Sequence, residues 1–216
     1  MRVNDSFSWE RYNKAPIVGI VRGLGSEIVM NIAKTYLDAR LYTLEITMNT
    51  PGVAILISTL RKEFPELNVG AGTVCNMQDL EIALNAGSQF IVTPIIDDDV
   101  IKACVKRDIA IFPGAFTPTE IYKAWRLGAS AVKVFPATQL GPQFIKDVLA
   151  PLNEIKLVPT GGVSKENIKS FFEAGVVGAG MGSSLLDKKL IADGDFEGLK
   201  MHFSNIKAEI SDYCKP

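Results

Sequence analysis

The alternation of two kinds of segment along the chain is the feature that most constrains its fold. Eight short segments are rich in apolar and β-branched residues, and longer segments with the apolar spacing of amphipathic helices separate them. We predict these short segments as strands: 16–23, 42–48, 68–74, 89–95, 109–115, 130–137, 155–162 and 177–184. Strands that alternate with helices are typical of parallel βαβ units.

Eight such units are the number that a closed (β/α)8 TIM barrel requires, and we predict this α/β fold. The alternative is an open, doubly wound sheet. The barrel is favoured because functional side chains or glycines recur at the C-terminal end of nearly every strand, whereas an open sheet gathers them at one crevice. A short helix at about 5–13 is predicted to cap the other mouth of the barrel. No linker, repeat or low-complexity segment divides residues 1–216, so we predict a single domain.

Composition and charge exclude several classes of partner. With 47% hydrophobic and 22% charged residues, the chain resembles an ordinary soluble globular protein. Its formal net charge of −1 gives no electrostatic reason to expect nucleic acid or an anionic membrane. No apolar run reaches the length of a membrane span, and the N-terminal segment is too polar for a signal peptide. Cys75, Cys104 and Cys214 lack metal-ligand spacing, which indicates reduced thiols and a cytoplasmic protein.

The single histidine narrows the chemistry further. His202 lies in a predicted amphipathic helix near the C-terminus, where we expect an exposed or packing role. One histidine excludes a Ser-His-Asp triad and a metal site with several histidine ligands. The acid–base groups of an enzyme would then be Glu, Asp, Lys, Tyr, a thiol or a phosphate of the substrate.

A lysine stands in the middle of an apolar strand, "SAVKVFPA". Side chains alternate along a strand, so Ala131, Lys133 and Phe135 share one face, while Val132 and Val134 share the other. If helices cover the valine face, Lys133 points into the barrel near its catalytic mouth. Removal from water lowers the pKa of an amine and leaves a neutral fraction that can attack a carbonyl as a Schiff-base nucleophile. A lysine that reaches solvent or pairs with a carboxylate is the structural alternative.

Few other charged residues fall within the predicted strands, and Glu45 and Arg22 are the chief ones. Glu45 lies among apolar neighbours in "TLEITM", on the same face as Thr43 and Thr47, and Arg22 ends the first strand. Glu45 and Lys133 could form a structural ion pair, or a proton-transfer group beside a nucleophilic amine. Three charges at one mouth favour function over packing. The Arg22 guanidinium is suited to bind a carboxylate, although a surface arginine is the plain alternative.

Glycine-rich turns follow several strands. Gly161 and Gly162 end the seventh predicted strand, and Gly182 and Ser183 end the eighth. Barrels often bind phosphate through the backbone N–H groups of these two turns, so we predict a phosphate site here, with turn geometry alone as the alternative. Thr73 ends "GAGT", where the glycines allow a ligand close approach and the hydroxyl can donate to an oxygen. A tight bend would explain the same glycines.

Taken together, these motifs resemble the 2-dehydro-3-deoxy-phosphogluconate (KDPG) aldolases and their galactonate (KDPGal) branch. The resemblance runs from "GIVRG" to "GSSLL" and is carried by "LEITMNTP", "VGAGTV", "FIVTP", "FPGAFTPTE", "VKVFPA", "GPQFIK", "VPTGGVS" and "GMGSSLL". It implies a metal-free homotrimer without a cofactor that acts on a phosphorylated 2-keto acid. It implies these roles: Lys133 as Schiff-base lysine, Glu45 as acid–base residue, Arg22, Thr73, Asn49, Pro94 and Phe135 at the pyruvyl and carboxylate end, and Gly161, Gly162, Gly182 and Ser183 at the phosphate.

One position departs from the family pattern. Many gluconate-type members carry an arginine where this chain has Asn49, and that arginine binds the substrate carboxylate, so Arg22 would carry more of that role. "MNTP" resembles the galactonate branch, and the choice between the two C4 epimers stays open. The expected reaction is a class I retro-aldol cleavage to pyruvate and glyceraldehyde 3-phosphate. The alternatives are a sugar-phosphate isomerase or epimerase with Glu45 as base, and a non-catalytic phosphosugar-binding protein.

Overall fold

The computed structural model describes residues 6–215, and within this range nine strands form two parallel sheets. The larger sheet has the order β5-β4-β3-β2-β1-β9, and the smaller has the order β6-β7-β8. The strand bounds are β1 Ile17–Val21, β2 Thr43–Thr47, β3 Asn68–Gly72, β4 Phe90–Val92, β5 Ala110–Phe112, β6 Gly114–Ala115, β7 Val132–Val134, β8 Leu157–Pro159 and β9 Ala179–Met181. All eight predicted segments therefore contain strands, and the alternation of strands and helices is confirmed as an α/β fold.

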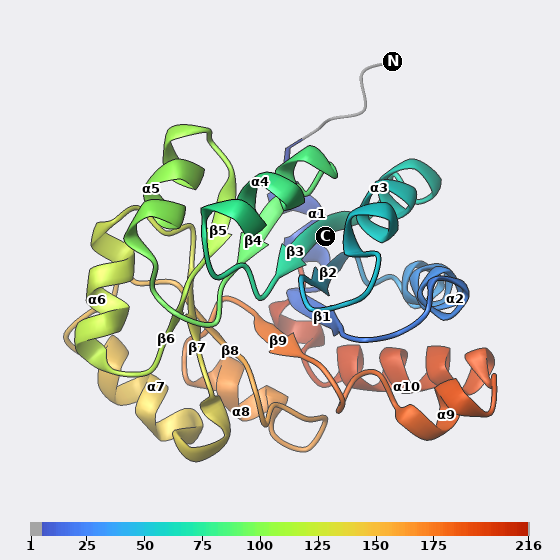
Figure 1. Ribbon diagram of the computed structural model, residues 1–216. Helices are drawn as coiled ribbons and strands as arrows, with labels where there is room; N and C mark the ends of the chain where they lie inside the picture. The colour runs from blue at the N-terminus through green and yellow to red at the C-terminus, as the bar shows by residue number, and fades with distance from the viewer. Residues whose placement is uncertain (1–5, 216) are drawn as a thin grey trace.

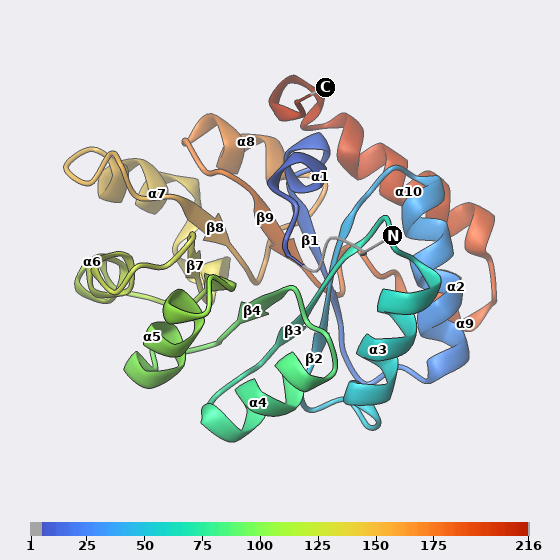
Figure 2. The same cartoon turned by 90° about the horizontal axis from the view of Figure 1, so that it is seen from above.

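Helices α2 to α8 and α10 lie outside the strands, as the view from above shows (Figure 2), and Figure 1 labels the α-helices and strands. The helix bounds are α1 Trp9–Lys14, α2 Ser26–Asp38, α3 Val53–Glu63, α4 Met77–Asn85, α5 Asp98–Lys106, α6 Pro118–Arg126, α7 Gly141–Leu149, α8 Ile168–Glu173, α9 Lys188–Ala192 and α10 Phe196–Ala208, with short 3₁₀ helices η1 Ala137–Gln139 and η2 Ser211–Tyr213. Helix α9 was not predicted from the sequence. It begins after Asp187, whose carboxylate accepts hydrogen bonds from the N–H groups of Lys189 and Leu190.

The fifth predicted strand is divided in two at Pro113. Proline has no N–H to donate to a neighbouring strand, so the ladder is interrupted there. The chain still passes directly from β5 to β6, and the Pro113 carbonyl accepts a hydrogen bond from the N–H of Lys133 at 2.9 Å. At the other end of the smaller sheet, an isolated parallel bridge joins Thr160, just after β8, to Gly180 in β9.

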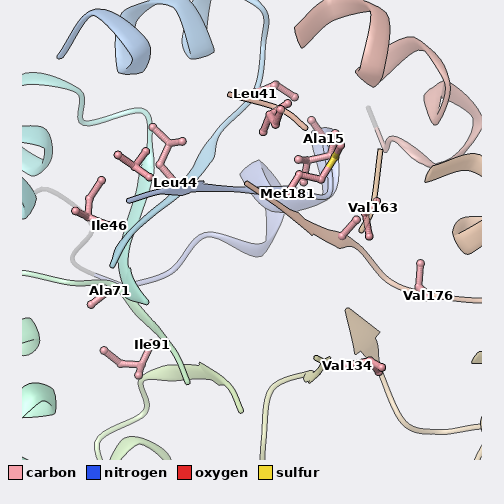
Figure 3. Packing of buried hydrophobic residues seen from close by; sticks show 14 of the residues in the cluster. Ala15, Leu41, Leu44, Ile46, Ala71, Ile91, Val134, Val163, Val176 and Met181 are labelled. Carbon is pink, nitrogen blue, oxygen red and sulfur yellow. The ribbon is translucent and has the colours of Figure 1, made fainter. Parts of the chain in front are cut away.

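The buried apolar residues form two separate clusters. The larger one lies between the strands and the helices and includes Val132 and Val134, together with the residues shown in Figure 3. The smaller one contains the residues of the opposite strand face, Val18, Phe90, Val92, Phe112, Ala131 and Val158, together with Phe7 and Tyr12. The predicted division of faces around Lys133 is thus confirmed for its neighbours, with Ala131 in one cluster and the two valines in the other.

The N-terminal segment packs against this second cluster. The rings of Phe7 and Phe90 lie 5.2 Å apart, and those of Tyr12 and Phe112 lie 6.1 Å apart, both between centroids. The aromatic residues of the segment before β1 therefore meet the inward-facing side chains of β4 and β5. Residue 5, where the predicted helix begins, lies outside the described residues.

No helix between residues 6 and 215 is both long and apolar enough to cross a membrane.

Candidate active site

Lys133 lies in the middle of β7, between Gly114 of β6 and Val158 of β8. Only 6% of the residue is exposed, and its Nζ lies 4.8 Å from the centroid of the Phe135 ring. Burial lowers the pKa of the Lys133 amine, the nearby Glu45 carboxylate opposes this shift, and the Arg22 guanidinium adds to it. The neutral amine, which is the nucleophilic form, is therefore more accessible here than in water.

Glu45 lies in β2, between Ile20 of β1 and Gly70 of β3, and is 2% exposed. Its carboxyl group lies directly over the backbone of Gly72, where the missing side chain provides the space: a Cβ at Gly72 would lie 2.6 Å from the carboxyl carbon. Burial raises the pKa of Glu45, and the charges of Lys133 and Arg22 only partly oppose this. The carboxyl is therefore predisposed to carry a proton before any ligand arrives.

The two groups meet beneath a larger opening. Glu45, Lys133 and Thr160 border a small cavity of about 10 Å³, whose lining also includes Val18, Val92 and Phe112. Among residues 6–215, no ion pair joins Glu45 to Lys133. Since neither charge is cancelled by direct contact, both shifts in pKa favour the neutral forms. The structural ion pair considered from the sequence is therefore not what the geometry shows.

Above Lys133 lies a pocket of about 710 Å³, within the range of small-molecule sites. The pocket contains seven of the predicted site residues: Arg22, Lys133, Phe135, Gly161, Gly162, Gly182 and Ser183. Leu24, Ile28, Leu186 and Ile191 supply an apolar wall that the sequence reasoning did not identify. The pocket therefore joins one buried amine, one guanidinium and two glycine-rich turns.

The two turns present unpaired backbone donors. Gly161 and Gly162 have φ values of +88° and +77°, and a Cβ at Gly162 would lie 2.8 Å from the Cα of Thr138, so this position requires glycine. Within the described chain, the N–H groups of Gly161, Gly162 and Ser183 donate to no acceptor. Unpaired N–H groups from two adjacent turns are suited to bind an anion.

Arg22 and Asn49 differ in their relation to the pocket. Both are exposed and follow the neighbouring strands β1 and β2. The Thr50 hydroxyl accepts a hydrogen bond from the N–H of Gly23 at 3.0 Å and lies 3.1 Å from the Thr47 hydroxyl, which fixes the loop that carries Arg22. Arg22 borders the pocket, whereas Asn49 does not.

Thr73 and Pro94, both half-buried, also lie outside the pocket lining. Thr73 follows β3 with a φ of +59°, a conformation that is uncommon for a β-branched residue. The Pro94 carbonyl packs against Gly114, where a Cβ would approach it within 2.5 Å. The structure thus places Pro94 in a contact between the loop after β4 and strand β6. The glycines before Thr73 make room for Phe90 at Gly70 and for Glu45 at Gly72, rather than for an approaching ligand.

The polar residues near the site that were missed from the sequence include the following three. Thr160 borders both the pocket and the small cavity, and it shares the face of Val158 and Lys133 by strand alternation, a signal that was available. Lys188, at the start of α9, adds a further cation to the lining. Cys75 lies close enough that an ionised thiolate there would raise the pKa of Lys133.

Among residues 6–215, no group of three or more His, Cys, Asp or Glu side chains is placed so that it could hold a metal ion.

Comparisons with known proteins agree with this geometry. The profile of a family described as KDPG and KHG aldolase matches residues 9–201. The 2-dehydro-3-deoxy-6-phosphogalactonate aldolase of Escherichia coli is 34% identical over 80% of this chain and 85% of its own length. The 2-dehydro-3-deoxy-phosphogluconate aldolase of Haemophilus influenzae is 31% identical over 87% and 89%. A native KDPGal structure superposes with a TM-score of 0.86 and 29% identity over 96% of this chain and 98% of that one.

Proposed function

The chain belongs to the KDPG and KHG aldolase family, and from this premise we propose that it cleaves a 2-keto-3-deoxy-6-phosphosugar acid, the gluconate or its C4 epimer, to pyruvate and glyceraldehyde 3-phosphate. Its activity is that of an aldolase, an aldehyde-lyase. The observation that carries the mechanism is the buried Lys133 amine at the base of the pocket, with its pKa lowered by burial.

Lys133 acts as the nucleophile in this mechanism. The neutral amine attacks the C2 ketone of the substrate, and the resulting carbinolamine loses water to form a protonated imine. When the C3–C4 bond breaks, its electron pair moves to C3 and the imine nitrogen, forming an enamine. Protonation of the enamine at C3 and hydrolysis of the imine release pyruvate and restore the amine.

Glu45 serves as acid first and as base second. Its raised pKa keeps a proton available for the hydroxyl that leaves the carbinolamine. Once the imine carries a positive charge, that charge favours the ionised carboxylate. The carboxylate then accepts the proton of the C4 hydroxyl, directly or through water, as the C3–C4 bond breaks.

The remaining residues bind the two anionic ends of the substrate. We propose that Arg22 binds the carboxylate and that the N–H groups of Gly161, Gly162 and Ser183, with Gly182 shaping the second turn, bind the phosphate. These two groups of donors border the same pocket as Lys133, which supports the assignment.

The family resemblance adds four further residues at the pyruvyl end. Phe135 borders the pocket and contacts the Lys133 amine, so we propose that it packs against the pyruvyl methylene. Thr73, Pro94 and Asn49 lie outside the lining, and for them the proposal rests on the resemblance alone.

Trapping with pyruvate and borohydride tests the mechanism. Reduction of the imine should fix a pyruvate-derived mass on Lys133, and the Lys133→Arg variant should form no adduct and lose cleavage activity. Lys169→Arg is the matched control, because it makes the same substitution at an exposed residue outside the pocket lining and should leave both the adduct and the cleavage activity unchanged. Absence of an adduct on Lys133 in the wild-type protein would refute the covalent mechanism and favour an isomerase or epimerase in which Glu45 acts alone.

The preference at C4 is decided by assay. The motif "MNTP", which contains Asn49, resembles the galactonate branch, so we propose that the galactonate epimer is the better substrate. Measuring kcat/KM for both C4 epimers tests this. A higher value for the gluconate epimer would contradict it.

The architecture around the site is proposed to be one closed eight-stranded barrel in a single domain of residues 1–216. Two features support closure: the direct passage from β5 to β6 at Pro113, and the bridge between Thr160 and Gly180. We propose that α1 and Phe7 cap the mouth opposite the active site, where Phe7 and Tyr12 pack on inward-facing rings. Deleting residues 1–14 should then lower the melting temperature.

We also propose a metal-independent, cytoplasmic homotrimer. Exposed Ile95 and Phe116 follow β4 and β6, Gly114 of β6 packs against Pro94, and such apolar side chains suit a subunit interface. Light scattering should give three times the chain mass of 23.5 kDa.

A chelator should leave the cleavage rate unchanged, and loss of activity that added metal restores would contradict a purely Schiff-base mechanism.

A further inference from the structure

His202, the only histidine of the chain, connects α10 to one of the two glycine-rich turns. The residue is half-buried, and its Nε2 lies 2.9 Å from the carbonyl oxygen of Ser184. A carbonyl oxygen only accepts hydrogen bonds, so Nε2 carries a proton and donates it here. This contact departs from the expectation of a merely exposed or packing role for His202.

Ser184 extends the connection to the second turn. Its hydroxyl donates a hydrogen bond to the carbonyl of Val163, which directly follows Gly161 and Gly162 and is 2% exposed. The turn after β9 is closed by its own backbone, because the carbonyl of Gly182 accepts from the N–H groups of the two residues after Ser184, at 3.0 and 2.8 Å. A chain of contacts therefore runs from His202 through Ser184 to both turns.

The helix that carries His202 is firmly packed. Leu199, Phe203 and Ile206 are fully buried, and the Phe203 ring lies 5.4 Å from the ring of Tyr36. A side chain on such an element is held in place, and its hydrogen bond fixes the position of whatever it contacts. The Ser183–Ser184 segment has no regular secondary structure of its own between β9 and α9.

We propose that His202 is a positioning residue for the phosphate subsite, fixing the Ser183–Ser184 turn so that its N–H groups and those of Gly161 and Gly162 converge on one anion. This proposal rests on the proposed function. It assigns His202 a role in selecting phosphorylated over unphosphorylated substrates, since an unphosphorylated 2-keto-4-hydroxy acid makes no use of the turns. Lys133 and Glu45 are untouched by the contact.

Kinetics with two substrates test the proposal. His202→Ala should raise KM for the phosphorylated substrate about tenfold, the ratio that corresponds to one lost hydrogen bond of about 1.4 kcal/mol. Its kcat, and its KM for an unphosphorylated 2-keto-4-hydroxy acid, should stay close to wild type. His202→Gln, whose amide nitrogen reaches about as far as Nε2, should restore most of the discrimination.

The control is Ser204→Ala on the exposed side of the same helix, where the hydroxyl bonds only to the Lys200 carbonyl, and it should change neither KM. If His202→Ala fails to fold, Ser184→Ala breaks the same chain at the next contact and should raise the same KM. An equal change in KM for both substrates would mean a general structural role and would overturn the proposal. An unchanged KM for the phosphorylated substrate would also overturn it. Wild-type trapping of pyruvate on Lys133 separates these results from failure of the aldolase mechanism itself.

Discussion

Replacing Gly72 with alanine displaces the Glu45 carboxyl without altering any titratable group. The φ of Gly72 lies outside the left-handed region, so the backbone accepts alanine. Its Cβ would lie 2.6 Å from the carboxyl carbon of Glu45, whereas ordinary contact begins at 3.4 Å. The carboxyl group must therefore move by at least about 0.8 Å, the difference between these two distances, because its Oε1 would lie closer still.

The size of that movement sets the expected loss of rate. A misplacement of about 1 Å in a catalytic group reduces the rate by about 100-fold, so we expect kcat of Gly72→Ala to fall by about 10- to 100-fold. The added methyl group also overpacks the interior, at a cost of about 1–3 kcal/mol of unfolding free energy. The melting temperature should fall by about 2–4 °C for each of these kcal/mol, which leaves a folded protein.

Two measurements check this reasoning. The release of pyruvate gives kcat, and end-point trapping with borohydride should still label Lys133, because the amine itself is unchanged. Gly25→Ala is the matched control, since a Cβ there meets nothing within 4 Å and the residue is exposed. A folded Gly72→Ala protein with wild-type kcat would refute the assignment of Glu45 as the acid–base group.

Three further predictions concern the charges of the site. Arg22 lowers the pKa of Lys133 and Glu45 raises it. The pH midpoint of cyanoborohydride trapping should therefore rise in Arg22→Gln and fall in Glu45→Gln. A shift of both midpoints in the same direction would contradict this. Since burial lowers the pKa of Lys133, protonation of this amine is less favourable in the folded than in the unfolded protein, and stability is lost as the pH falls from the unfolded pKa through the folded one. The double variant Lys133→Met, Glu45→Gln lacks this loss, so its free energy of unfolding in urea at pH 7 should be about 1–4 kcal/mol higher than that of the wild type. A lower value would show that the pair stabilises the fold. Lys188→Ala should raise KM for the phosphorylated substrate at low salt. The effect should fade at high salt, because exposed charges are screened beyond about 10 Å at 0.1 M ionic strength. An increase in KM that does not depend on salt would argue against a purely electrostatic role.

The order of elements could be predicted because it depends on local pattern. Strand alternation around Lys133 correctly assigned Ala131 to the inner cluster and Val132 and Val134 to the helix-facing one. The break of the fifth strand was foreseeable from Pro113, which cannot donate to a ladder. The five-residue helix α9 was harder, because its signals are a capping Asp187 and a closing glycine rather than an apolar repeat.

The site was predicted well where residues lie on strands and poorly where they lie on loops. Strand residues such as Lys133 and Glu45 have their direction fixed by alternation, so their meeting in the interior follows from parity. Asn49 and Pro94 come after strands, and no period fixes the direction of a loop side chain. The role of Gly72 was hidden for another reason: its purpose depends on a side chain from the neighbouring strand, a contact that only the folded sheet creates.

The mutual arrangement of Lys133 and Glu45 also explains how the site holds charge in an apolar interior. Before substrate binds, burial lowers the pKa of the amine and raises that of the carboxyl, which shifts both groups toward their neutral forms. Formation of the protonated imine places a positive charge at the same depth, and loss of the Glu45 proton supplies the compensating negative charge. In the proposed cycle, the pair is therefore electrically neutral both before the imine forms and after Glu45 has given up its proton. A permanent ion pair would already be stabilised before substrate bound, and it would lack both the neutral nucleophile and the available proton that imine formation requires.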